Sequence, residues 1–360
     1  MQRKAVLEQI ARRETIARQD LAGIDLSGAD LSGGRFEQVN FSGADFSGAE
    51  VGRTGFAGCN FSGARFCGSR INQCNWKDMR MPGADFSGAH LFMLLLGKSD
   101  FSGAVFRQAR IERCTFQEAS LERAIFHQAG VEQNTFQKAA MSGADFSGAR
   151  LVRAIFSASD LRSLILDRAT LVKILFRNCN FSAYDFSGLH MEIVQFDGAN
   201  LDNANFSGCH LPMCNFSGAS LHQANFEQAR LDHTLFFGAR LQAARLCRVF
   251  CRQAVFSEAD LSAADCREGD FELSLFQKAC LQGADFRGSN LKNADFSHAD
   301  LTNADLRSTG LYMARFHKTL EEGALYGESK KTLLQNEDAD QAEAEAFVPK
   351  AKPRNPGGKD

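Results

Sequence analysis

The sequence contains little tryptophan, tyrosine or proline, and it has no long hydrophobic run. Its 360 residues include one Trp, three Tyr and five Pro. The longest apolar cluster, Leu91 to Leu96, is far shorter than the roughly 20 residues that cross a bilayer as a helix, so we expect no membrane span. The opening MQRKAVLEQIARRE lacks the apolar core of a secretory signal. We therefore predict a cytoplasmic protein, with export by a Sec-independent route left open.

Neither sign of charge predominates, and no familiar catalytic motif is present. Lys and Arg total 41 against 43 Asp and Glu, a net charge of −2 that favours neither nucleic acid nor an acidic partner. Eleven Cys, an odd number in a chain this long, indicate free thiols in a reducing compartment. The eight His form no HExxH motif, and no GxxxxGK[ST] loop occurs. We predict a protein that is not an enzyme and needs no cofactor or metal.

Phenylalanine and glycine are abundant instead, and a period of five residues places them. Every fifth residue from Leu21 to Phe316 is a large apolar residue, with only Cys251 and Cys266 as exceptions. A small residue, most often Ala, usually lies two positions earlier, and Ser-Gly often follows, as in FSGADFSGA. This period fits neither an α-helix nor a flat strand. It requires a chain that turns a corner every five residues and buries one large and one small side chain at each.

The motif A-[D/N]-[L/F]-S-G resembles the pentapeptide-repeat family, over about 296 residues. The resemblance implies an all-β solenoid, a right-handed quadrilateral parallel β-helix in which four pentapeptides close one coil of 20 residues. Residues 21–316 would then form about 15 coils, a rod of roughly 70 Å at the spacing of paired strands.

Both ends of the repeat are predicted to differ from it. Residues 1–20 are expected to form a capping helix, because Val6 and Ile10 share one face and an open solenoid end needs a cover. Residues 317–360 are expected to be a polar, mostly disordered tail, with a short helix at Thr319 to Leu325. Family members are often dimers through this end, so the resemblance also implies a homodimer.

Sorting the central residues by their place in the coil brings 28 of the 32 Phe into inward columns, mainly two opposite ones. Stacked rings along these columns would fill the interior and leave no ligand cavity. The predicted core stack comprises Phe36, Phe56, Phe116, Phe136 and Phe156 in one column and Phe46, Phe66 and Phe86 in the other.

Function must then lie on the outward positions, which form three kinds of wall. A basic wall contains Arg53, Arg70, Arg110, Arg113, Arg150, Arg153, Lys173 and Arg230. An acidic wall contains Asp25, Asp45, Asp85, Asp145, Asp185, Asp265, Asp285 and Asp305. An apolar wall contains Leu95, Ile155, Leu175, Leu235, Val255 and Leu275. Solvation, turn chemistry and β-propensity are the alternatives to a binding role, but soluble monomers rarely expose a long apolar stripe.

A rod with flat walls and a filled interior offers no cleft for catalysis, so we predict a non-enzymatic scaffold or adaptor that binds a protein. Residues 6–33 resemble the start of pentapeptide-repeat regions in accessory proteins of bacterial type VI secretion, which implies loading of an effector or spike component. Two alternatives remain: a DNA mimic that binds DNA gyrase or topoisomerase, as some family members do, and a secreted effector that binds a host protein. The basic wall argues against mimicry. We expect no direct binding of nucleic acid.

Overall fold

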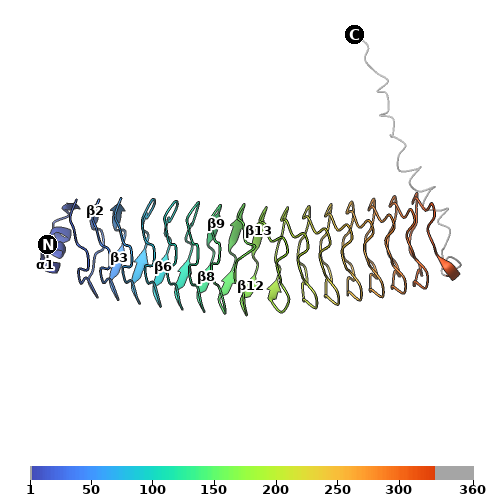
Figure 1. The fold of residues 1–360 in the computed structure, drawn as a ribbon, viewed down its shortest axis with the longest axis horizontal. Coiled ribbons are helices and arrows are strands. Elements are labelled where there is room, and N and C mark those ends of the chain that lie inside the picture. The colour runs from blue at the N-terminus through green and yellow to red at the C-terminus, as the bar shows by residue number, and fades with distance from the viewer. Residues whose placement is uncertain (1, 329–360) are drawn as a thin grey trace, which may run out of the picture.

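The computed structural model describes residues 2–328, which form a rod with the helix α1 at one end (Figure 1). The chain winds as an all-β parallel solenoid, so the predicted class of fold is confirmed. Each residue of the ladder pairs with the residue 20 positions later, as in Ile16 with Phe36, and the last such pair joins Asp305 to Leu325. Four pentapeptides therefore make one turn.

Regular strands, each of three residues, occupy only the first part of the rod. They lie between Thr15 and Glu192, about nine turns, and beyond them the ladder continues as isolated bridges. The expected 15 or so coils are thus not all built from regular strands. One sheet contains β1 (Thr15–Ala17), β2 (Arg35–Glu37) and β4 (Gly55–Ala57). A second contains β9 (Thr135–Gln137), β11 (Ile155–Ser157) and β13 (Leu175–Arg177). The largest contains β3 (Glu50–Gly52), β5 (Arg70–Asn72), β6 (His90–Phe92), β7 (Arg110–Glu112), β8 (Gly130–Glu132), β10 (Arg150–Val152), β12 (Thr170–Val172) and β14 (His190–Glu192).

The ladder is longer at both ends than the repeat pattern indicates. It begins at Thr15, inside the segment assigned to the N-terminal cap, and it reaches Leu325. The helix predicted at Thr319 to Leu325 is wrong, because Leu320 and Leu325 pair with the preceding turn and the backbone between them follows the turn. Residues 329–360 of the predicted tail lie outside the described residues.

Helix α1 (Arg3–Ala11) lies against the first turn. Its Val6 is fully buried, and Leu7 and Ile10 pack on the core. An Arg3 guanidinium nitrogen donates to the carbonyl oxygen of Ser27 at 2.7 Å and fixes the helix to the first turn of the ladder. The helix therefore covers apolar side chains that an open end would expose to water.

Stacked aromatic rings fill the interior of the solenoid. All eight residues of the predicted core stack are buried. The ring centroids of Phe46 and Phe66 lie 4.7 Å apart at an interplanar angle of 6°, and those of Phe136 and Phe156 are also 4.7 Å apart. Trp76 interrupts one column and meets Phe56 edge-on. Offset stacks of this kind add to the free energy that ring burial already supplies.

Polar side chains at the small inward position bind the backbone of neighbouring turns. Asn134 is fully buried, donates through Nδ2 to the carbonyl oxygen of Ile111 at 2.8 Å and accepts from the backbone N–H of Cys114 at 2.7 Å. Thr54 and Thr234 occupy the same column and donate to carbonyl oxygens 23 residues earlier. These bonds satisfy the polar groups that such positions bury.

Candidate functional site

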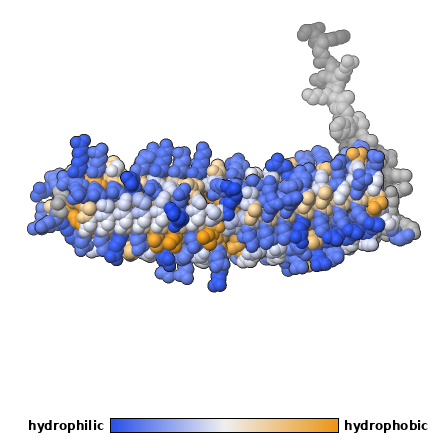
Figure 2. Space-filling model, viewed as in Figure 1, coloured by the Kyte–Doolittle hydropathy of each residue, from blue (hydrophilic) through white to orange (hydrophobic). Residues whose placement is uncertain are grey.

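The apolar wall runs along one face of the rod. The backbone ladder joins Thr135, Ile155 and Leu175 in successive turns, and it joins Leu235, Val255 and Leu275 in the same way. Exposed fractions are 55% for Leu95, 39% for Ile155 and 40% for Leu235, whereas Leu175, Val255 and Leu275 are half-buried. Figure 2 shows hydrophobic patches on a surface that is otherwise mostly hydrophilic.

Two polar residues divide this wall into two segments. Gln195 and Asn215 continue the same ladder between Leu175 and Leu235. The sequence-based prediction missed Phe237, which is 50% exposed and points outward two residues after Leu235. The alternation of inward and outward side chains could have identified it, because Phe236 is the inward residue between them.

The basic wall is exposed along its whole length, but carboxylates neutralise part of it. Arg70 lies 3.2 Å from Glu50, and Arg110 and Arg153 pair with Glu112 and Glu132. Two further members contact aromatic rings: Arg113 lies over Phe92 and Arg230 over Phe250. Neither these two nor Arg53, Arg150 and Lys173 form an ion pair with any described residue. The wall is therefore of mixed charge. This was not predicted from the sequence, because only its Arg and Lys residues were considered there.

The acidic wall stabilises turns. All eight of its Asp accept a hydrogen bond from the backbone N–H two residues later, for example Asp25 from Ser27 at 2.9 Å. Hydrogen bonds from the hydroxyl and the backbone N–H of Ser27 hold the pKa of Asp25 below its usual value. The arrangement matches the known preference of Asp for turns.

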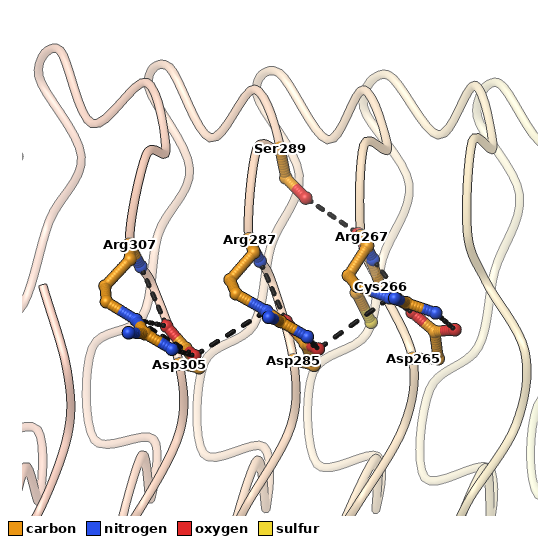
Figure 3. Close-up of polar contacts among 8 residues, drawn as sticks. All are labelled: Asp265, Cys266, Arg267, Asp285, Arg287, Ser289, Asp305 and Arg307. Carbon is orange, nitrogen blue, oxygen red and sulfur yellow. Dashed lines mark hydrogen bonds and ion pairs between the residues drawn. The ribbon is translucent and has the colours of Figure 1, made fainter.

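Arginine side chains neutralise the C-terminal end of this wall (Figure 3). Arg267, Arg287 and Arg307 each pair with the Asp two residues earlier, at 2.7, 2.6 and 2.6 Å respectively. Two of them also reach the next turn, where Arg267 lies 3.7 Å from Asp285. This end of the wall has no free run of negative charge to imitate a nucleic acid backbone.

Most thiols of the described chain are buried and held neutral. Eight of the 11 Cys are buried, and burial raises the pKa of Cys59 and of Cys74 to about 11. Thiols held neutral in this way are poor nucleophiles and poor metal ligands. Between residues 2 and 328, no three His, Cys, Asp or Glu side chains are grouped as a metal site would require.

No described helix can span a membrane, since α1 has nine residues and is neither long nor apolar enough.

Family models place the chain among known proteins. The model for pentapeptide repeats (8 copies) matches residues 20–54, 59–92 and 96–129 and, in overlapping blocks, residues 199–319. A second model, for a pentapeptide repeat region, matches residues 132–206. The chain belongs to the pentapeptide-repeat family. Neither of these models describes a catalytic domain.

Solved pentapeptide-repeat structures are similar to parts of this protein. QnrB1, a plasmid-mediated fluoroquinolone resistance protein, is 26% identical over 44% of this chain and 82% of its own, with a TM-score of 0.30. A pentapeptide repeat protein from the thylakoid lumen of Arabidopsis thaliana is 32% identical over 29% of this chain and 69% of its own, with a TM-score of 0.24. HetL, involved in heterocyst differentiation regulation in Nostoc sp. strain PCC 7120, is 21% identical over 91% of this chain and 98% of its own, with a TM-score of 0.17. TM-scores this low carry no argument about what this protein binds. No curated protein sequence matches the chain.

Proposed function

We propose that this pentapeptide-repeat protein is a non-enzymatic scaffold that binds another protein along its apolar wall. The observation that carries the proposal is the exposure of Leu95, Ile155 and Leu235 in a single column of the backbone ladder. The interior of the solenoid is filled with packed rings, so binding energy must come from the outer surface. Aligned apolar side chains on a rigid support lose little conformational entropy when a partner covers them.

We further propose that the partner belongs to bacterial type VI secretion, which would make the protein an adaptor for an effector or spike component. This narrower proposal rests on residues 6–33 alone. DNA mimicry has less support, because the Asp residues of the acidic wall serve turns and several pair with Arg. A secreted effector with a host protein as partner would use the same apolar wall.

Affinity capture from the native bacterium, followed by mass spectrometry, tests the proposal. The test variant combines Ile155→Lys, Leu175→Lys and Leu235→Lys, and the control combines Val105→Lys, Ile125→Lys and Ile165→Lys. The control adds the same charge on the opposite face, where these three residues also point outward. We expect the control to retain its partners and the wall variant to lose them. Retention of every partner by a folded wall variant would contradict the proposal.

A further inference from the structure

We propose that the segment of the apolar wall from Leu95 to Leu175 binds an amphipathic α-helix of the partner, one whose apolar stripe is flanked by acidic residues. This inference rests on the proposed function and names the kind of element that the wall recognises. It is carried by three independent features of the surface: a hollow, a spacing and a charge pattern.

The hollow lies at the N-terminal end of the segment, beside Leu95, and has a volume of about 410 Å³. It exists because residue 97 is a glycine, whereas the equivalent outward positions in the next two turns carry Gln117 and Gln137. Leu95 and Thr115 supply apolar surface to it, and the charged residues Lys77, Lys98 and Glu118 also line it. A leucine or methionine side chain of a partner could be buried there with its neighbours still in contact with the wall.

The spacing of the wall matches a helix that lies along the rod. Successive turns are about 4.8 Å apart, so the four intervals from Leu95 to Leu175 span roughly 19 Å, the length of about 13 helical residues. An amphipathic helix presents one apolar side chain per helical turn of about 5.4 Å. Over four such turns its side chains move out of register with those of the wall by only about 2 Å. Side chains on one face of an extended strand recur about every 6.7 Å. Over four repeats they would move out of register with the wall by about 8 Å, which is more than the spacing between two turns of the solenoid.

The charge beside the wall identifies the flanks of the helix. The three outward columns that border the segment, which begin at Met93, Gly97 and Lys98, hold six cations and one carboxylate, Glu118, which lies 3.9 Å from Lys98. Glu132 reaches in from the neighbouring face to pair with Arg153. Lys138 and Lys173, on opposite sides of the wall, form no ion pair with any described residue. The six cations are Arg113, Arg153 and Lys173 on one side and Lys98, Lys138 and Arg177 on the other. Such a border attracts Glu or Asp and repels Lys or Arg.

Binding of synthetic helical peptides to the full-length chain tests this inference. The probe is a peptide of about 15 residues with Leu at i, i+4, i+7 and i+11 and Glu beside them. Its controls are the same peptide with Lys in place of Glu and a scrambled peptide of identical composition. The protein variants are Gly97→Gln, which fills the hollow with the residue found in the next two turns, and Lys138→Glu with Lys173→Glu. Arg107→Glu, on the opposite face, is the matched control.

We expect the acidic helix to bind, with affinity that falls as salt is added. Each test variant should weaken it at least about tenfold, and Arg107→Glu should leave it unchanged. Absence of binding, or equal binding of the Lys peptide or of the scrambled peptide, would overturn the inference. The capture experiment tests the scaffold proposal separately. If the wall variant loses its partner but no helical peptide binds, the scaffold proposal is supported and only the helix inference is wrong.

Discussion

Arg287 joins two turns of the solenoid, since it pairs with Asp285 in its own turn and reaches Asp305 in the next. Its guanidinium lies 2.6 Å from the carboxylate of Asp285 and 3.7 Å from that of Asp305 (Figure 3). The hydrogen bond from Arg287 holds the pKa of Asp285 below its usual value. The two side chains thus form part of a column of alternating charge that also contains Asp265, Arg267 and Arg307.

Replacing Arg287 by Ala should weaken the fold slightly and in a pH-dependent way. A carboxyl whose pKa is lowered on folding stabilises the protein above its unfolded pKa of about 4, and that contribution is lost as the pH falls through the folded pKa. We expect Arg287→Ala to unfold at a temperature no more than about 2 °C lower at pH 7, since the pair is exposed, and this difference to vanish at low pH. Thermal unfolding of both proteins at several pH values measures it. A difference that grows as the pH falls would contradict this reasoning.

Asn134 should be more important for stability than any exposed pair. Asn134→Ala removes two buried hydrogen bonds, one to the carbonyl of Ile111 and one from the N–H of Cys114, which should cost about 1–3 kcal/mol. Asn134→Thr is the matched control, because Thr54 and Thr234 in the same column donate to the equivalent carbonyl oxygen, so this variant keeps the donated bond and loses the accepted one. Denaturant unfolding gives both values, and equal losses for the two variants would show that the donated hydrogen bond is unimportant.

The stacked rings of the core predict that the free energy of unfolding depends on the size of the side chain at each stacked position. Phe156→Ala removes a fully buried ring from between Phe136 and Phe176 and should cost about 3–5 kcal/mol. Phe156→Leu should cost much less, since Leu96 fills the same position elsewhere in this column. Chemical denaturation of both variants compares them, and a similar loss for Leu and Ala would show that stacking geometry outweighs volume.

Cysteine modification should separate buried from half-buried thiols. Burial raises the pKa of Cys114 to about 12, so almost no thiolate forms there at pH 8. We expect iodoacetamide to label only Cys67, Cys247 and Cys280 in the native protein, and all 11 Cys after unfolding. Mass spectrometry of the labelled peptides reads the pattern. Rapid native labelling of Cys114 would show that the solenoid opens locally.

The five-residue period indicated a chain that turns a corner every five residues and buries one large residue at each, and the resemblance to pentapeptide repeats supplied the class of fold. The end of the ladder, residues 317–325, was missed because Glu321 stands where the pattern expects a large apolar residue. No further turn covers that position in the described chain, so a charged residue is tolerated there. Tyr326, five residues later, is buried and resumes the pattern.

The surface was harder to predict than the core. The columns of Arg were visible in the sequence, but the Glu residues that pair with them lie in other columns or turns, as Glu132 does with Arg153. Whether a Glu neutralises an Arg depends on how far the two side chains extend between columns and turns. Phe237 escaped notice for a related reason, since only the inward residues follow the strict period.

Capture by the two triple-Lys variants tests the central claim most directly. The account predicts that a partner bound by the unmodified protein is kept when Val105, Ile125 and Ile165 are changed and is lost when Ile155, Leu175 and Leu235 are changed, with both variants folded by circular dichroism. If the partner stays with the Ile155, Leu175 and Leu235 variant, the apolar wall is not the binding surface and the account is wrong.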